Sequence, residues 1–345
     1  MSSNLSTASE CSAPQWMWRY LGVPPTGEGQ RFRLRDQEFI VEGHIPRSRA
    51  LLSEAQTQTL ETFGFKWHKR DTFESVESLN NMRRWLTKRY GDIARASWLE
   101  DYGPAPLLVD AGCGAAMSAI ELLAPVLPQI RYFGIDVSRA VDVARSRFTE
   151  RGFDAAFMQA DITKLPFREQ SVDLVFSEGV LHHTDSTRGA LEALSRLLKR
   201  GGRILFYVYR RKGPIREFTD DYVREKLQSM SAQESWDALM PLTKLGKLLS
   251  ELDIEIDIAE AIDVLGIPAG RISLQRFFYW NVFKAYYRPE LTLDEMNHIN
   301  FDWYAPRNAW RQSSEEVLRW CAQCGLVVER HVEEEAGITV IARKA

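Results

Sequence analysis

The chain has few of the features that place a protein in a membrane or outside the cell. Its 345 residues include only four cysteines, too few for a disulfide framework. No apolar run reaches the roughly 18 residues of a membrane span, and residues 1–10 lack the charged and then apolar pattern of a signal peptide. We therefore expect a cytoplasmic protein with no membrane partner and with a disordered tail at the start.

An excess of charge of one sign is also missing. Lys and Arg number 44 against 47 Asp and Glu, which gives a net charge of −3. A nucleic-acid-binding domain usually carries a clear basic excess. The balance therefore predicts no nucleic-acid partner, and the length allows one large domain or two small ones.

The most informative stretch is a short apolar strand that runs into a glycine turn. Residues 107–109 form an apolar run too short for a helix, and the turn follows with Asp110, Gly112, Cys113 and Gly114. Glycines let the backbone turn tightly and approach a ligand closely. The helix predicted from Met117 offers free backbone N–H groups, so the stretch is typical of a nucleoside-binding turn.

Further apolar strands follow at regular intervals, and predicted helices separate them; these strands are 131–135, 156–161, 171–176 and 203–209. The alternation predicts an α/β fold with a doubly wound, mostly parallel sheet. Asp110, Asp136 and Asp161 stand where strands end, and ligands of such sheets bind at those ends. Ala116 replaces the third glycine of the phosphate-binding turn, which favours a nucleoside cofactor without a phosphate.

Together these motifs resemble the class I S-adenosylmethionine (SAM)-dependent methyltransferases, most of all the ubiquinone/menaquinone-type branch. The matching stretches are 110–114, 134–136, 161–167, 173–177 and 181–183, and the similarity covers about residues 105–210 and a closing hairpin at 326–343. The resemblance implies a Rossmann-like, seven-stranded sheet and SAM as the cofactor. The cofactor-binding residues that it implies are Asp110, Gly112, Cys113, Gly114, Asp136, Val137, Asp161, Ile162, Ser177 and Glu178.

The resemblance also assigns parts of the cofactor to these residues. The methionine part would lie on the glycine turn, and Asp136 would hold the ribose. Asp161 and Ile162 would flank the adenine, although Asp161 alternatively caps a helix. Ser177 and Glu178 would border the methyl-transfer site.

The remaining segments surround a SAM-binding core at residues 105–209. Residues 1–50 would hold the tail and a small β module. This module is similar to the zinc-ribbon-like module of bacterial methyltransferases but lacks its cysteine pairs, so we expect no zinc. Residues 51–104 indicate a helical lid, 210–311 a helical insert that caps the substrate, and 312–345 a closing helix and β-hairpin. Within the insert we expect helices over 217–230, 232–252 and 273–287.

The aromatic residues outside the core allow two interpretations. Phe65 and its neighbours in the lid face the sulfonium of SAM, where a ring face attracts a cation, or they form an ordinary core of the lid helices. The aromatic-rich insert covers the carboxyl ends of the strands. It builds either the acceptor pocket or the surface of a homodimer.

The candidate catalytic side chains are His182, His183, Tyr207 and Tyr304. Because the two histidines follow the transfer site, one of them acts as a general base with a near-neutral pKa or makes a structural hydrogen bond. A metal triad of His182, His298 and Asp302 is a weaker alternative, and we expect no metal. Cys321 and Cys324 fall within a helix and indicate core packing.

We therefore expect a SAM-dependent methyltransferase that acts on a small molecule, such as a natural product, a sugar or an amino-acid-like acid. One alternative keeps the fold and is similar to the azetidine-2-carboxylate synthases, in which the amine of SAM attacks its own γ-carbon and expels methylthioadenosine. A second alternative is a SAM-binding partner protein without catalytic activity.

Overall fold

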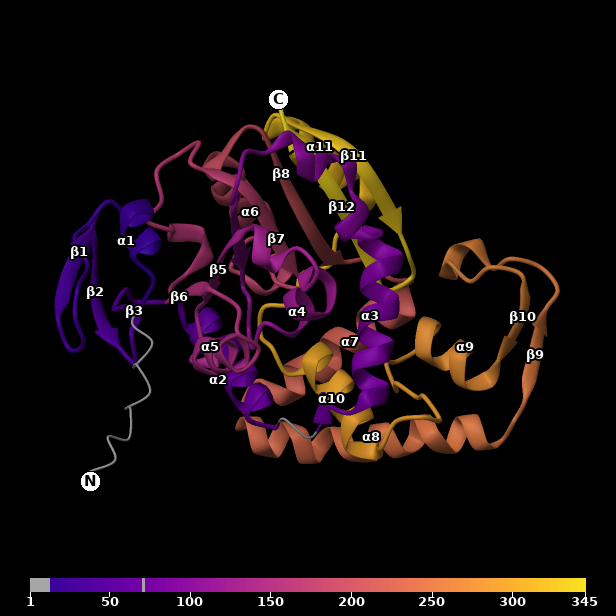
Figure 1. The fold of residues 1–345 in the computed structure, drawn as a ribbon. Helices are drawn as coiled ribbons and strands as arrows, with labels where there is room; N and C mark the ends of the chain where they lie inside the picture. Colours follow the sequence, from indigo (N-terminus) through magenta and orange to yellow (C-terminus); the bar gives the residue numbers. More distant parts are fainter. Residues whose placement is uncertain (1–12, 70–71) are drawn as a thin grey trace, which may run out of the picture.

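The computed structural model describes residues 13–69 and 72–345 (Figure 1). The predicted disordered tail falls on residues 1–12, which lie outside the described residues. No helix within the described ranges is both long and apolar enough to cross a membrane.

A ten-stranded sheet, in the order β1-β2-β3-β6-β5-β4-β7-β8-β12-β11, runs through the molecule. The predicted doubly wound, mostly parallel arrangement is confirmed, since neighbours from β6 to β8 pair in parallel and β12 and β11 close one edge antiparallel. The seven strands of this part are β4 (Leu107–Ala111), β5 (Arg131–Asp136), β6 (Ala155–Gln159), β7 (Val172–Glu178), β8 (Leu198–Tyr209), β11 (Leu326–Glu333) and β12 (Gly337–Lys344).

The sheet has three more strands than the seven predicted, because the N-terminal module joins its edge. This module consists of α1 (Gln15–Leu21), β1 (Arg31–Leu34), β2 (Gln37–Glu42) and β3 (Ile45–Ser48). The contact to the core is a parallel pairing of Arg47 on β3 with Gln159 on β6. The β-hairpin pattern was readable in the sequence, but its register with a strand more than a hundred residues away was not.

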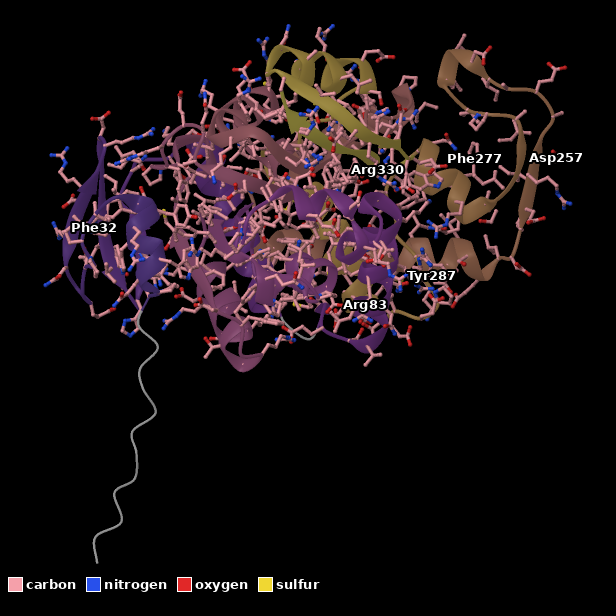
Figure 2. All side chains as sticks on the ribbon, turned by 45° about the horizontal axis from the view of Figure 1, so that its top comes forward. Phe32, Arg83, Asp257, Phe277, Tyr287 and Arg330 are labelled. Atoms are coloured by element: carbon pink, nitrogen blue, oxygen red, sulfur yellow. The ribbon has the colours of Figure 1, made fainter. Side chains whose placement is uncertain are left out.

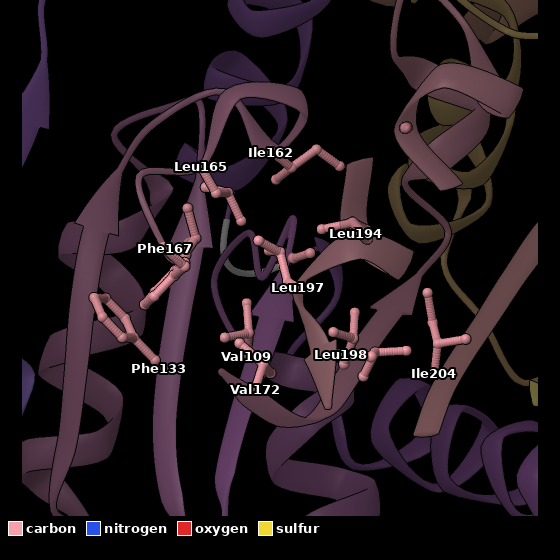
Figure 3. Packing of buried hydrophobic residues seen from close by; sticks show 14 of the residues in the cluster. Val109, Phe133, Ile162, Leu165, Phe167, Val172, Leu194, Leu197, Leu198 and Ile204 are labelled. Atoms are coloured by element: carbon pink, nitrogen blue, oxygen red, sulfur yellow. The ribbon is translucent and has the colours of Figure 1, made fainter. Parts of the chain in front are cut away.

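The central strands read as continuous apolar runs because both of their faces are covered. Val109, Phe133 and Val172 are completely buried in one cluster, which Figure 3 shows packed between the strands and the helix that carries Leu194 and Leu197. The helices that flank the core are α4 (Met117–Leu123), α5 (Ala140–Glu150), α6 (Thr187–Leu197) and α11 (Ser314–Gln323), with short 3₁₀ turns at η4 (Leu127–Gln129), η5 (Ile162–Lys164) and η6 (Leu181–His183).

Between the N-terminal module and the core, the described residues form α2 (Glu54–His68), α3 (Val76–Tyr90) and the short 3₁₀ turns η2 (Ile93–Arg95) and η3 (Ser97–Asp101). Ser53 caps α2 and Ser75 caps α3 through their side-chain oxygens. On α3, Leu86 and Tyr90 are buried against the sheet-side core, so this helix is anchored by one face.

The segment between β8 and α11 is mostly helical. It contains α7 (Pro214–Leu227), α8 (Ala232–Glu251), the hairpin β9 (Glu255–Ile258) and β10 (Gly270–Ser273) with the turn η7 (Asp263–Leu265), and then α9 (Leu274–Asn281) and α10 (Leu293–Tyr304). The hairpin was not predicted, and Figure 1 shows it projecting from the body at the right of the view. The helix that we expected over 273–287 ends at Asn281, and α10 was missed.

Candidate cofactor and acceptor site

A cavity of about 520 Å³ lies at the carboxyl ends of the central strands, under the lid helices and the insert. This volume falls within the range of small-molecule sites, about 300–1,000 Å³. From the core, the predicted residues that line it are Asp110, Gly112, Cys113, Gly114, Asp136, Val137, Asp161, Ile162 and Glu178.

The glycine turn brings the backbone close to other parts of the cavity wall. Gly112 has φ +86°, and a Cβ built there would lie 2.2 Å from Val180 Cγ1. Gly114 has φ +51°, and its Cβ would lie 2.8 Å from the ring of Trp67 on α2. Only glycine fits both the left-handed conformation and the space at these positions.

Asp136 is the acid that the turn holds most firmly. One carboxylate oxygen accepts from the backbone N–H of Gly114 at 2.9 Å, and the other accepts from the backbone N–H and hydroxyl of Ser138 at 2.8 and 2.7 Å. Burial raises the pKa of Asp136, although these hydrogen bonds favour its charged form. The carboxylate is thus fixed at the end of β5, where a ribose would be held.

Asp161 both caps a short helical turn and lines the cavity. Its Oδ1 accepts from the backbone N–H and the hydroxyl of Thr163, at 2.8 and 2.7 Å, and so caps the short turn η5. Asp161 and Ile162 both line the cavity. The capping interaction orients the carboxyl group while its second oxygen faces other partners, with Lys164 Nζ at 3.9 Å.

Asp110 is 3% exposed at the end of β4 and accepts a hydrogen bond from the hydroxyl of Tyr132. Burial raises the pKa of Asp110 to about 7. A positively charged ligand in the cavity would favour the ionised form of this acid. Cys113 lines the same wall, and burial raises the pKa of its thiol well above the usual value, so it is an inert thiol.

Glu178, at the end of β7, binds two side chains of the lid. Its carboxylate accepts from the guanidinium of Arg89 and from the hydroxyl of Tyr90, both at the end of α3. Ser177, its neighbour, points the other way: it is completely buried, donates to the carbonyl of Ala111 at 2.8 Å and does not line the cavity. Strand alternation places these two side chains on opposite faces of β7.

The lid helix α2 presents one face to the cavity. Phe63 and Trp67 lie four residues apart and both line it, together with Lys66. Phe65 does not; it packs against Trp236 and Phe301, with ring centroids 6.2 and 5.5 Å away. The assignment of Phe65 to the cofactor was therefore wrong. Phe65 lies two residues after Phe63 on the helix, and this spacing rotates its side chain by about 200°, away from the cavity.

The two histidines of η6 are buried, and only His183 lines the cavity. His183 Nδ1 lies 2.6 Å from the carbonyl oxygen of Asn308 and so donates to it, which leaves Nε2 unprotonated. Burial lowers the pKa of His183 to about 4, below the near-neutral range expected for a base.

His182 packs against Tyr209, with the two ring centroids 3.7 Å apart and the ring planes tilted by 35°. Neither of its ring nitrogens has a hydrogen-bond partner among the residues that the structure describes. Burial lowers its pKa well below the usual value. The catalytic assignment of His182 is therefore replaced by a role in packing.

Of the tyrosine candidates, Tyr207 lines the cavity and Tyr304 does not. Burial raises the pKa of Tyr207 to about 12, and its ring lies under the Arg89 guanidinium at 3.6 Å. Tyr304 is completely buried and its hydroxyl accepts from the backbone N–H of Lys284 at 2.7 Å, so it supports the insert and is removed from the catalytic candidates.

Asp302 joins the lid to the insert. Lys66 Nζ lies 2.5 Å from one of its oxygens, and the hydroxyl of Tyr209 lies 3.3 Å from the other. Burial alone would raise the pKa of Asp302, but the charge of Lys66 lowers it well below its usual range. His298 instead pairs its Nδ1 with the Thr72 hydroxyl at 2.7 Å. Across residues 13–69 and 72–345, no three His, Cys, Asp or Glu side chains form a metal-binding group, so the triad is not formed.

The insert contributes side chains to the far end of the cavity that the sequence did not place there. They are Arg276, Tyr279, Trp280, Lys284, Tyr286 and Arg288. Their lining position follows from the packing of α9 and the chain after it, which no local pattern encodes.

The donor set fits a SAM-like cofactor. The two glycines leave room for backbone approach, Asp136 is a fixed acceptor at the ribose position, and buried acids face a cavity that would hold a positively charged sulfur. The arrangement can bind such a nucleoside beneath aromatic side chains of the lid, with a second compartment lined by the insert.

Comparison with known proteins agrees with this geometry. Residues 109–206 match the family described as a methyltransferase domain. A Bos taurus protein named "Probable tRNA methyltransferase 9B" is 28% identical over 163 residues, which are 44% of this chain and 31% of that protein. The chain thus spans about a third of that relative.

Two further similarities differ in kind. A Mycobacterium ulcerans phthiotriol/phenolphthiotriol dimycocerosates methyltransferase is 29% identical over 140 residues, covering 40% of this chain and 50% of that one. The crystal structure of Burkholderia thailandensis 1,6-didemethyltoxoflavin-N1-methyltransferase is 12% identical, with 92% of this chain and 99% of that chain covered and a TM-score of 0.45. Residues 109–206 thus match a methyltransferase domain, and they contribute the parallel strands β4 to β8 at the centre of the sheet.

Proposed function

We propose that the protein transfers a methyl group from SAM to a small-molecule acceptor bound under the insert. The observation that carries the proposal is one continuous cavity of about 520 Å³, which joins the nucleoside-binding strand ends to a compartment lined by the insert. SAM supplies a methyl group on a positively charged sulfur. The task left to the chain is to position the acceptor in line and to exclude water.

The lid residues support this positioning role. Phe63 and Trp67 face the cavity from α2, where ring faces favour a cation by about 1–2 kcal/mol when desolvated. The Lys66–Asp302 ion pair links this helix to α10 of the insert. The two parts that cover the cavity are thus held together beside the transfer site.

A proton acceptor is needed only for a nucleophile that carries a proton. His183 Nε2 is the candidate, because Nδ1 donates to Asn308 and the ring stays neutral at neutral pH. Its low pKa makes it a weak base. The geometry therefore favours an acceptor whose nucleophile is already deprotonated or loses its proton readily.

The proposed acceptor is a small molecule, whereas the name of the bovine relative gives tRNA as its acceptor. A net charge of −3 favours a small molecule over a nucleic acid, and Tyr279 and Lys284 of the acceptor compartment are buried. The mycobacterial relative is named for acceptors that are not nucleic acids.

A second candidate uses SAM as the only substrate. The aromatic side chains that enclose the cavity favour it, because this reaction needs no acceptor molecule; the amine of SAM loses its ammonium proton and then attacks its own γ-carbon. That reaction releases methylthioadenosine and leaves a four-membered cyclic amino acid.

The test is mass spectrometry of the purified protein with SAM alone, and then with methyl-labelled SAM plus either total tRNA or a tRNA-free metabolite extract. We expect bound SAM without turnover in the first case and label in the metabolite fraction in the last. Methylthioadenosine from SAM alone would replace the proposal with the second candidate. Label in the tRNA would contradict the small-molecule acceptor.

A further inference from the structure

Three basic side chains at the insert end of the cavity have no carboxylate within ion-pair distance among the residues that the structure describes. Arg276 lies on α9, and Lys284 and Arg288 lie on the chain that follows it; all three line the cavity. None of them forms an ion pair with a carboxylate anywhere in the described part of the chain. Lys284 is 7% exposed, and Arg288 Nε is buried without a hydrogen-bond partner among those residues.

The other cations of the cavity are compensated. Lys66 pairs with Asp302, and Arg89 pairs with Glu178. The contrast matters because an unpaired charge in a site removed from water is strongly unfavourable. Arginine cannot avoid this penalty by losing its proton, whereas burial lowers the pKa of Lys284 to about 7. The insert end therefore holds positive charge that a negative group of a ligand would balance, and such a group would also favour the charged form of Lys284.

Aromatic rings line the same end of the cavity. The Arg276 guanidinium lies 5.3 Å from the ring centroid of Tyr279, which in turn contacts Trp280 at 4.5 Å and Tyr286 at 6.0 Å. All three rings line the cavity. Pockets of this composition combine a flat apolar wall with a few polar groups that fix the orientation of the ligand.

Resting on the proposed function, we propose that the acceptor is a small aromatic molecule that bears an oxyanion, a carboxylate or a phosphate. Arg276, Lys284 and Arg288 bind the oxyanion, and the rings of Tyr279, Trp280 and Tyr286 pack against the flat part. The anion then directs the rest of the acceptor toward the strand ends, where SAM lies.

The test is calorimetric titration of the complex with S-adenosylhomocysteine, using benzoate, phenyl phosphate and the neutral isostere benzamide as probes. We expect at least one anion to bind about tenfold more tightly than benzamide. Benzoate and phenyl phosphate separate the carboxylate from the phosphate. Equal binding of benzamide, or no binding of either anion, would overturn the proposal.

The variants are Arg276→Gln and Lys284→Gln, with Arg271→Gln as the matched control. Arg271 lies on the exposed hairpin and pairs with Glu255 at 2.9 Å. We expect both test variants to lower the affinity for the anion by about tenfold or more and to leave the affinity for SAM unchanged. The control variant should change neither affinity. Arg276 is half-exposed, so its variant tests the site even where Lys284→Gln fails to fold.

Two outcomes separate this inference from the function on which it rests. A drop in SAM affinity in both variants would show that these cations bind the carboxylate of SAM, which overturns the inference and leaves methyl transfer standing. Wild-type protein that binds neither SAM nor S-adenosylhomocysteine would contradict the proposed function. The probes titrated into the free protein would then still decide whether the anion site exists.

Discussion

At the scale of single residues, the cofactor end of the cavity depends on groups that fix one another. The Asp136 carboxylate holds the backbone N–H of Gly114, and the Gly114 backbone in turn lies against Trp67 of the lid. A change at one of these positions therefore alters both the turn and the wall that faces it. The effect on ligand affinity should exceed the loss of one hydrogen bond.

Replacing Asp136 with alanine tests this arrangement. The substitution removes the proposed ribose acceptor and leaves the Gly114 N–H without its partner, and an unpaired buried group costs about 1–3 kcal/mol. We expect the Kd for SAM, measured by calorimetry, to rise by about tenfold or more. Asp257→Ala is the control, because Figure 2 shows Asp257 on the outlying hairpin. Unchanged affinity in Asp136→Ala would remove the ribose assignment.

The buried His183 should leave a signature in the pH dependence of stability. Its folded pKa of about 4 lies below the value near 6.5 of the unfolded chain. The unfolded state thus binds the extra proton first, so stability is complete above pH 6.5 and is lost as the pH falls toward 4. From pH 7 to pH 5 this amounts to about 2 kcal/mol.

Comparison with His183→Gln isolates that effect from the similar contribution of His182, whose pKa is also lowered by burial. Denaturant unfolding at the two pH values should show a smaller loss of stability on acidification in the variant than in the wild type. Equal losses in the two proteins would mean that His183 is already accessible to protons in the folded state.

Residues of the cofactor end were readable in the sequence because each lies directly after an apolar strand. Asp110, Asp136 and Asp161 all line the cavity as predicted. The sequence did not predict that Lys284 and Arg288 line the cavity together, since they lie on irregular chain whose position depends on the packing of α9. The prediction that Ser177 borders the methyl-transfer site was wrong for a local reason, because strand alternation points its side chain into the core.

At the scale of elements, α2 divides its aromatic residues between two tasks. Phe63 and Trp67 face the cavity, whereas Phe65 packs on Trp236 and Phe301 of the insert. The two interpretations offered by the sequence, a cofactor lid and an ordinary core, thus describe opposite faces of one helix. Helical periodicity decides which residue belongs to which face.

Paired substitutions on α2 should separate these tasks. Trp67→Ala removes cavity wall, so we expect weaker SAM binding by calorimetry with a small change in the free energy of unfolding. Phe65→Ala removes packing against the insert, so we expect about 1–3 kcal/mol less stability in denaturant unfolding with SAM affinity unchanged. The reverse pattern would mean that Phe65 faces the ligand.

In the insert, the sequence predicted the long helices but not the short hairpin. The helices expected over 217–230 and 232–252 correspond to α7 and α8, since each carries helical patterning and α8 starts with a capping box. The hairpin β9–β10 was missed because its strands are only four residues long and largely exposed. Short exposed strands show little of the alternation that burial imposes on sequence.

At the scale of the whole molecule, the N-terminal module belongs to the same hydrophobic core as the SAM-binding sheet. Met17, Trp18 and Phe39 are buried in one cluster with Phe133 and Phe167 of the core. The edge strand β6 is covered by β3. An unprotected edge strand tends to pair with other chains, so the module also shields the sheet.

Removal of residues 1–50 should therefore destabilise the entire protein. Each buried side chain of this size contributes about 1.5–3 kcal/mol, and the shortened chain would also expose the edge of β6. We expect a fall in Tm of about 10 °C or more, together with aggregation, since each kcal/mol moves the Tm of a domain of this size by about 2–4 °C. Differential scanning calorimetry and light scattering measure the two effects.

Phe39→Ala reaches the same contact without shortening the chain. Phe39 is completely buried, so the substitution should cost about 3–5 kcal/mol in denaturant unfolding. Leu51→Ala is the matched control, because Leu51 is 92% exposed and should change stability by less than about 0.5 kcal/mol. SAM affinity should remain at the wild-type level in both variants, since neither side chain lines the cavity. A stable Phe39→Ala protein would show instead that the module folds on the edge of the sheet without supporting it, and that the domain at 105–209 needs only its own strands.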